Sequence, residues 1–242
     1  AACGSAPTLV DLGAGNCAKA AALFAHLQPR RYVALDISVD YLAESLQRLQ
    51  QEHPGIEMAG VGLDFSAHLS LPASLADPAA LLFYPGSSIG NFAPGDALHL
   101  LREARALAPE GALLIGVDRV KSTAELEAAY DDPLGVTAAF NLNLLRHLNR
   151  LAGTDFNPRE WRHVALYDEE QARIEMHLEA RQALTVRWPG GERRFAASER
   201  IHTENSYKWT PEGFAALLHD AGWARVQPWT DARGRFMVFL AH

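Results

Sequence analysis

Glycine and acidic residues stand directly after short apolar runs in the first part of the chain. The first run ends at Gly13 and Gly15, and glycine lets a backbone turn tightly and approach a bound molecule without a Cβ clash. Asp36 follows Gly13 by 23 positions, a distance at which a carboxylate can accept from both hydroxyls of a ribose. Asp64 and Phe65 follow a third run, where a carboxylate can accept from an adenine amino group and a ring can flank the base. Together these residues predict a site for an adenosine-containing molecule.

The residues after the glycine turn narrow the class of that molecule. A dinucleotide-binding loop carries a third glycine, whereas Asn16 and Cys17 stand at that place here. This departs from pyrophosphate binding at a helix N-terminus and fits a cofactor without phosphate groups, S-adenosylmethionine. Lys19, in the helix that follows, is interpreted either as a solvent-exposed residue or as a partner for the methionine carboxylate of that cofactor. An NAD-dependent oxidoreductase is a more distant interpretation, which the absent third glycine weakens.

The loop after the fourth apolar run is rich in glycine, serine and amide groups. It reads FYPGSSIGNF over Phe83–Phe92 and leaves many backbone donors outside regular structure. Asn91 has two interpretations: it caps the next helix, or it binds a polar group of a substrate beside the methyl donor. We interpret the stretch from Gly86 to Gly90 as lacking the G-x-S-x-G spacing of a hydrolase nucleophile elbow, so hydrolytic chemistry is disfavoured.

A carboxylate and a hydroxyl two residues apart lie late in the chain. Glu204 and Ser206 point to the same side if the segment is extended, and together they can hold a ring with two nitrogens, such as imidazole. A capping or solvated polar pair is the alternative. Met176 is expected in a strand core or, less commonly, in a pocket wall. Tyr130 either packs against its neighbours or directs its hydroxyl to a carboxylate.

Metal and disulfide chemistry find little support in the sequence. None of the ten histidines has the spacing of a metal-binding motif, and His202 with Glu204 is a weak pair. The cysteines, Cys3 and Cys17, are too few for a disulfide scaffold or a four-thiolate metal site. We therefore expect no metal ion at the site.

The elements that must position these residues alternate between short apolar runs and helical patterns. This alternation predicts an α/β fold, a mostly parallel sheet with helices on both faces, in which ligands bind beyond the carboxyl ends of the strands. The expected strands are Thr8–Leu12, Arg31–Leu35, Ile56–Leu63, Ala79–Tyr84 and Gly111–Val117, with helices over residues 17–27, 39–51 and 94–108.

The pattern changes after the fifth strand. Residues 122–151 predict one or two helices, and antiparallel strands are expected at Trp161–Tyr167, Arg173–Trp188 and Glu192–Ser198, with a hairpin turn at 189–191. The sheet then resumes with a helix over Thr210–Ala221 and two closing strands, Ala224–Thr230 and Phe236–Ala241, the last one antiparallel. The expected domains are residues 1–121 with 208–242, for the cofactor, and an inserted α+β substrate domain, residues 122–207.

Composition limits the kinds of partner. The 242 residues are 48% hydrophobic and 21% charged, the balance of a globular protein with a core. A net charge of -7 disfavours binding to nucleic acid or anionic membranes. There is no apolar run of ~20 residues, and the first five residues, AACGS, do not resemble a signal peptide. We expect a cytoplasmic monomer that handles a small molecule.

Five segments together resemble the histidine-specific S-adenosylmethionine-dependent methyltransferases, typified by the L-histidine Nα-methyltransferase of ergothioneine biosynthesis. The match covers essentially the whole chain. The resemblance implies a Rossmann-like class I methyltransferase sheet with a second, inserted domain, and three successive methylations of the α-amino group of histidine to give hercynine. The segments are FYPGSSIGNF (Phe83–Phe92), GVDRVK (Gly116–Lys121), AYDDPLGVTAAFNLN (Ala129–Asn143), RIEMHL (Arg173–Leu178) and HTENSYK (His202–Lys208).

The resemblance also implies roles for individual residues. Gly86 and Asn91 correspond to residues that face the α-amino and carboxylate end of the substrate. Tyr130 corresponds to a residue that holds the carboxylate, and Glu204 and Ser206 correspond to residues that hold the imidazole. Asn91 and Tyr130 are the expected catalytic residues, because they would fix the amine in front of the methyl group.

Met176 corresponds to a residue that lines the ring pocket. The chain departs from the family pattern in two places. Family members carry a helical stretch before the first strand, so we expect a truncated form or a fragment that keeps cofactor binding. Asn16 and Cys17 replace small hydroxyl residues, which would soften cofactor affinity. Two alternatives stay open: the acceptor is another aromatic amino acid or an indole amine, or the chain binds the cofactor without turnover.

Overall fold

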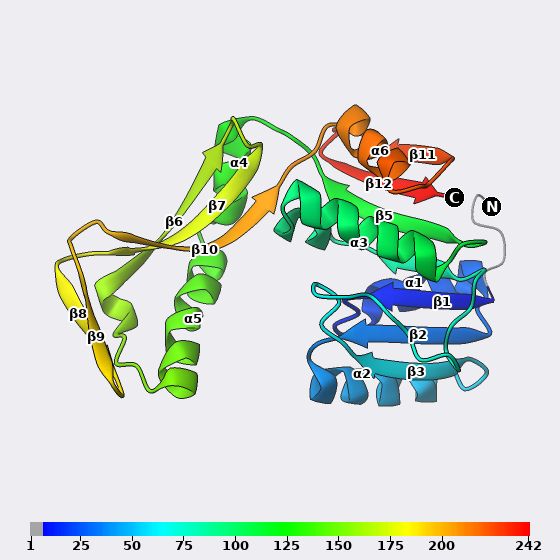
Figure 1. Ribbon diagram of the computed structural model, residues 1–242, viewed down its shortest axis with the longest axis horizontal. Helices are drawn as coiled ribbons and strands as arrows, with labels where there is room; N and C mark the ends of the chain where they lie inside the picture. The colour runs from blue at the N-terminus through cyan, green and yellow to red at the C-terminus, as the bar shows by residue number, and fades with distance from the viewer. Residues whose placement is uncertain (1–6) are drawn as a thin grey trace. The chain divides into compact units, whose positions relative to one another are not determined.

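The computed structural model describes residues 7–242, which form two compact units (Figure 1). One unit runs up to Arg119 and resumes at Trp209–His242, and the other is Val120–Lys208. The inserted unit thus begins two residues before the predicted substrate domain and ends one residue after it. Cys3 and the segment AACGS, on which the signal-peptide expectation depends, lie outside the described residues.

A seven-stranded sheet forms the centre of the first unit. Five of its strands are parallel neighbours, and β12 runs antiparallel to both β5 and β11, as the sequence predicts. The strand order is β11-β12-β5-β4-β1-β2-β3. The strands are β1 (Thr8–Leu12), β2 (Arg31–Asp36), β3 (Glu57–Gly62), β4 (Leu81–Tyr84), β5 (Ala112–Asp118), β11 (Val226–Thr230) and β12 (Phe236–Ala241).

Helices cover both faces of this sheet because successive strand residues point to opposite sides. In β1, Leu9 joins the core under two helices of one face, while Val10 joins the core under the helices of the other face. Each fully buried leucine or valine contributes about 1.5–3 kcal/mol. The first pair of helices is α1 (Ala18–Leu27) and α2 (Val39–Glu52), and the second is α3 (Pro94–Leu107) and α6 (Pro211–Asp220).

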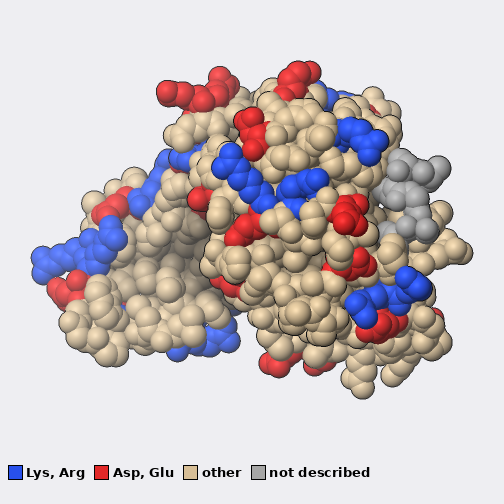
Figure 2. Space-filling view, turned by 45° about the vertical axis from the view of Figure 1, so that its right-hand side comes forward, with Lys and Arg blue, Asp and Glu red and all other residues tan. Residues whose placement is uncertain are grey.

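Capping and turn chemistry fix where these helices begin. Thr210 accepts a hydrogen bond from the backbone N–H of Gly213 and so caps α6, as predicted, with Pro211 at its first position. Within residues 7–242, no helix combines the length and the apolar character needed to cross a membrane. Acidic and basic side chains are interspersed over the face drawn in Figure 2.

The second unit packs two helices on a small antiparallel sheet with the order β10-β7-β6. Its separate hairpin turns at Pro189 and Gly190, as predicted, and Gly190 has a φ of 96° that suits glycine. The elements are α4 (Thr123–Tyr130), α5 (Val136–Ala152), η2 (Pro158–Glu160), β6 (Trp161–Asp168), β7 (Arg173–Ala180), β8 (Leu184–Trp188), β9 (Gly191–Phe195) and β10 (Arg200–Tyr207).

The strand predictions in this unit need two corrections. Arg173–Trp188 is not one strand: β7 ends at Ala180, and β8 belongs to a different sheet. The chain leaves the three-stranded sheet after β7, where the backbone N–H of Arg181 donates to the carbonyl of Glu160. The guanidinium of Arg181 donates to the carbonyl of Trp161. The second correction is that no strand was predicted for β10, which pairs with β7 in the three-stranded sheet. Strand propensity does not reveal where a chain changes its pairing partner.

Candidate functional site

The glycine turn between β1 and α1 adopts a conformation that requires glycine. Gly13 and Gly15 have φ angles of 73° and 53°, and the backbone N–H groups of Gly13 and Ala14 both donate to the carbonyl of Leu35 at 2.9 Å. A Cβ on Gly13 would lie 3.7 Å from the ring of Phe65. The turn is therefore fastened to the end of β2 and lies beside the residues that follow β3.

Asp36 ties the glycine turn to the start of α2. Its Oδ2 accepts from the backbone N–H of Gly15 and its Oδ1 from that of Ser38, each at 2.9 Å. A carboxylate has about four acceptor positions, so a fixed Asp36 can still accept from two ligand hydroxyls. This geometry suits the predicted ribose contact.

A cavity of about 720 Å³ lies at the carboxyl ends of these strands, within the size range of cofactor sites. It brings together most of the residues predicted for the cofactor, and Asn91 with them. Gly15, Lys19 and Gly86 do not line it. Its lining includes Gly13, Asp36, Ile37, Asp64, Phe65, Tyr84, Ser88, Asn91 and Phe92.

One wall of the cavity is aromatic. Phe65 meets Tyr84 edge to face, with ring centroids 5.8 Å apart and an interplanar angle of 87°. Tyr84 is almost fully buried, and burial raises the pKa of its phenol. Next to this wall, Asp64 Oδ1 accepts from the backbone N–H of Ser66 at 3.1 Å. The ring and the carboxylate predicted to contact adenine are thus held by neighbours before any ligand binds.

Lys19 is exposed but lies against the loop after β4. A Cβ placed on Gly86 would be 2.8 Å from Lys19 Nζ, and Gly86 has a φ of 81°. The positive φ favours glycine at this position, and the Lys19 ammonium lies close to the backbone there. The exposure of Lys19 agrees with the interpretation as a solvent-exposed residue, and contact with a cofactor carboxylate stays a prediction.

Asp11 is a buried acid that the sequence did not single out for a role. It is 1% exposed, and Tyr32 donates to its Oδ2 at 2.8 Å, while Oδ1 has no hydrogen-bond partner among the described residues. Burial raises the pKa of Asp11 to about 6, and the Tyr32 hydrogen bond and the charge of Lys19 only partly oppose this. An acidic residue inside an otherwise apolar strand, two positions before a glycine turn, was the signal available in the sequence.

The loop after β4 corrects two expectations. Asn91 ends η1 (Ser88–Asn91) and is exposed, whereas Ala93 stands at the N-cap of α3, so the capping interpretation of Asn91 is wrong. The stretch from Gly86 to Gly90 does have the spacing G-x-S-x-G. However, the residue with a positive φ is Ser87, at 64°, and its hydroxyl accepts from a backbone N–H of β5 instead of standing free as a nucleophile.

In the second unit, Tyr130 and Ser206 meet directly although they are far apart in the sequence. Their hydroxyl oxygens lie 2.8 Å apart, and Lys208 Nζ donates to each of them at 2.8 Å. Ser206 and Lys208 are 5% and 3% exposed, so this cluster is largely shielded from water. Sequence reasoning missed Lys208, although the alternation of Glu204, Ser206 and Lys208 could have indicated a shared side.

Glu204 and Met176 are paired in register between β10 and β7. A register shift between His202 and Glu204 marks an irregularity in β10. Burial raises the pKa of Glu204, and the nearby charge of Lys208 opposes that shift. Met176 is buried in a small cluster that Tyr130 packs against, so its ordinary core role holds, and its pocket role stays a prediction.

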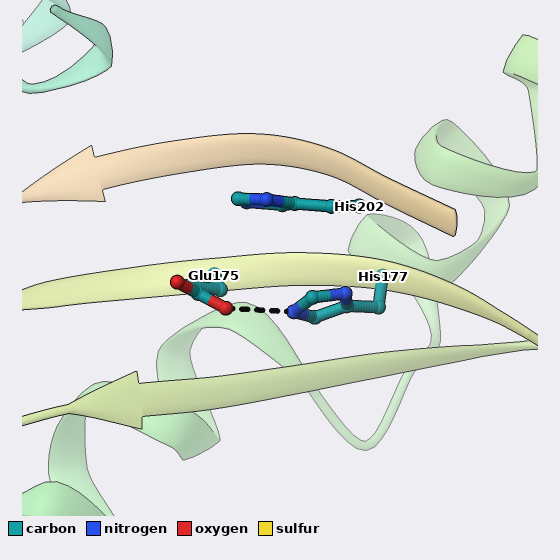
Figure 3. Close-up of side chains that lie close together, drawn as sticks. All are labelled: Glu175, His177 and His202. Atoms are coloured by element: carbon teal, nitrogen blue, oxygen red, sulfur yellow. Dashed lines mark hydrogen bonds and ion pairs between the residues drawn. The ribbon is translucent and has the colours of Figure 1, made fainter. Parts of the chain in front are cut away.

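The weak pair of His202 and Glu204 does not form through side chains, because His202 Nε2 instead lies 3.2 Å from the backbone carbonyl of Glu204. Figure 3 shows His202 above His177, with ring centroids 4.7 Å apart and planes 25° apart. His177 Nε2 lies 3.0 Å from Glu175 Oε2, and Arg173 donates to the other oxygen of that carboxylate. Near-parallel rings and a guanidinium on the acid do not direct three lone pairs to one cation.

The sheet order, the glycine turn after β1, the acid at the end of β2 and the antiparallel β12 define the class I methyltransferase fold. Solved structures agree on the fold. The CcbJ methyltransferase from Streptomyces caelestis matches 100% of this chain and 85% of its own, with a TM-score of 0.56 and 18% identity. A putative O-methyltransferase from Nostoc punctiforme matches 98% of this chain and 51% of its own, with a TM-score of 0.54 and 12% identity.

Sequence comparison assigns the chain to a particular family of methyltransferases. Residues 1–242 match the family model described as histidine-specific methyltransferase, SAM-dependent. A histidine N-alpha-methyltransferase of Mycolicibacterium smegmatis is 38% identical over 98% of this chain and 75% of its own length, and one of Mycobacterium tuberculosis has the same values. An ergothioneine biosynthesis protein 1 of Neurospora crassa is 32% identical over 93% of this chain and 26% of its own. The chain belongs to this family and is an S-adenosylmethionine-dependent N-methyltransferase.

Proposed function

We propose that the chain methylates the α-amino nitrogen of L-histidine with S-adenosylmethionine and forms N,N,N-trimethylhistidine, hercynine. The observation that carries the proposal is the buried cluster of Tyr130 and Ser206 beside Glu204 in the second unit. The side chains assigned to the carboxylate and to the ring of one amino acid thus lie together. The two mycobacterial relatives named for this activity support the same acceptor.

The cavity at the glycine turn fits the cofactor. Asp36 would accept from the ribose hydroxyls, Asp64 from the adenine amino group, and Phe65 would flank the base. Lys19, beside Gly86, would hold the methionine carboxylate. S-adenosylmethionine supplies a methyl group on a positively charged sulfur, and the chain has to place an amine opposite that sulfur.

Positioning supplies most of the rate enhancement in this mechanism. The amine must be neutral, since an ammonium has no lone pair, and a pocket that excludes water lowers the pKa of a bound amine. Asn91 would orient the nitrogen through its side-chain carbonyl oxygen, with the reacting atoms ~3–3.5 Å apart and in line. No strong protein base is needed, because the proton can leave to water before each transfer.

Glu204 and Ser206 would hold the imidazole, with Met176 along the ring, while Tyr130 and the backbone at Gly86 hold the amino acid end. A hydrogen bond to a charged group contributes roughly 1.5–3 kcal/mol when it is kept dry. This arrangement would select the α-amino nitrogen to face the methyl group, because Glu204 and Ser206 would occupy both ring nitrogens.

Incubation of the chain with histidine and S-adenosylmethionine, followed by mass spectrometry, tests the proposal. We expect a product that carries three added methyl groups, with mono- and dimethylated forms at early times. Methylation of tryptophan or an indole amine but not of histidine would favour the alternative acceptor. Binding of both ligands without product would favour a binding protein.

A further inference from the structure

Lys208 is a buried cation with a defined place in the second unit. Its Nζ lies 2.8 Å from both the Tyr130 and the Ser206 hydroxyl oxygens and 4.6 Å from the centre of the Tyr130 ring. Lys208 directly follows β10, while Tyr130 ends α4, 78 residues earlier in the chain. Burying an ammonium is costly unless hydrogen bonds and an opposite charge compensate.

The protons in this cluster can be counted. The ammonium donates to both hydroxyl oxygens, so Tyr130 and Ser206 each accept one hydrogen bond from it. The contact between the two oxygens uses one further proton, which comes from one of the two hydroxyls. One O–H therefore remains to donate outside the cluster. When Ser206 donates to Tyr130, the remaining proton is that of Tyr130, and Ser206 offers only a lone pair.

The positive charge of Lys208 also affects the groups around it. The positive charge of Lys208 reaches Glu204, whose pKa it lowers against the effect of burial. A hydroxyl that accepts from an ammonium becomes a stronger donor toward an anion, since hydrogen-bonded groups polarise one another. The anion best suited to a Tyr130 hydroxyl polarised in this way is a carboxylate.

We propose that Lys208 is the positioning residue that makes this site prefer an α-amino acid over the corresponding amine. Its ammonium orders the Tyr130 and Ser206 hydroxyls and adds positive charge beside the substrate carboxylate. This inference rests on the proposed function, because it assigns the carboxylate to Tyr130. It adds a residue to which no role follows from the family resemblance given above.

The test compares histidine with histamine, which keeps the imidazole and the amine but lacks the carboxylate. Any effect of Lys208 on the ring, including one through Glu204, acts on both substrates and cancels in the ratio of their kcat/KM values. The variants are Lys208→Met and Lys208→Gln, which remove the charge, and Lys208→Arg, which keeps it. Arg194→Met removes an equal charge from a side chain that is 84% exposed in the same unit and serves as the matched control.

We expect the histidine-to-histamine ratio to fall about tenfold or more in Lys208→Met and Lys208→Gln, through KM more than through kcat. The ratio should stay within about threefold of wild type in Lys208→Arg and unchanged in Arg194→Met. The affinity for S-adenosylhomocysteine should be unchanged in all four, which shows that the cofactor unit is folded. An equal loss for both substrates would make Lys208 merely structural and overturn the inference.

Failure of the proposed function has a different signature. It appears in the wild-type chain, as an absence of methylated histidine, before any variant is compared. Calorimetric titration with histidine and with histamine then still reports on Lys208, because binding needs no turnover. If the wild-type chain binds the two equally, the preference does not exist and the inference is wrong.

Discussion

Replacing Glu204 with glutamine keeps the size of the side chain and removes the charge proposed to hold the imidazole. Glu204 is half-buried, and burial is the main cause of its raised pKa. A hydrogen bond to a charged group contributes about 1.5–3 kcal/mol, and one between neutral groups about 0.5–1.5 kcal/mol. The difference of about 1–1.5 kcal/mol corresponds to a loss of about five- to twelvefold in histidine affinity.

Calorimetric titrations with histidine and with S-adenosylhomocysteine, each alone, measure this loss. The affinity for S-adenosylhomocysteine should not change, because every residue assigned to the cofactor belongs to the other unit. Glu192→Gln, at a carboxylate that is 48% exposed on β9, is the matched control and should change neither affinity. A Glu204→Gln variant that loses cofactor binding but keeps histidine binding would reverse the assignment.

The difference in histidine affinity between the wild-type chain and Glu204→Gln should depend on pH. Because the pKa of Glu204 is raised, the wild-type side chain takes up its proton at a higher pH than an exposed glutamate does. Below that pKa the wild-type carboxyl is neutral, like the glutamine. The ratio of wild-type to variant histidine affinity should therefore approach one as the pH falls. A ratio that does not change with pH would contradict this.

Three further predictions concern the first unit. Asp36→Asn should weaken S-adenosylhomocysteine binding about tenfold or more, because charged acceptors are lost at the ribose; an unchanged calorimetric affinity would contradict the ribose assignment. The pKa of Asp11 is about 6 in the folded chain and 3.8 in its ordinary, unfolded state, so the folded chain binds more protons between these two pH values. The free energy of unfolding therefore falls by roughly 3 kcal/mol as the pH rises through this range. Asp11→Asn should abolish this loss, and denaturant unfolding at pH 4 and pH 7 should show the gap between the two proteins growing with pH; a constant gap would show that Asp11 ionises normally. Thr210→Ala should cost about 1 kcal/mol by removing the cap of α6, as measured by thermal melting, whereas Thr210→Ser keeps a capping hydroxyl and should change the melting temperature less; equal effects of the two variants would contradict the capping role.

The edge of the sheet that carries the cofactor residues was predictable from the sequence. Gly13, Asp36 and Asp64 each follow a short apolar run, and parallel strands bring their carboxyl ends to one edge. Their joint place in one cavity follows from that rule alone. The closeness of Lys19 to Gly86 was not predicted, because it depends on the conformation that the Lys19 side chain adopts.

The second unit was less predictable because its pairing is non-local. The residues between β7 and β8 continue a strand-like pattern, and only pairing with β6, β9 and β10 decides where each strand ends. The role of the G-x-S-x-G stretch was similarly decided by backbone angles, since Ser87 and not Ser88 has the positive φ. Local propensity carries no information on either choice.

The sequence by itself determined the α/β order, the glycine turn, the acids after β2 and β3 and the alternation of Glu204, Ser206 and Lys208, because periodicity and turn chemistry are local properties. Only the tertiary structure decided that Lys208 and Ser206 meet Tyr130, and that Asp11 is buried deeply enough to raise its pKa. Both depend on packing between segments distant in the chain, which sets distance and exclusion of water, and these in turn set the strength of every charge in the site.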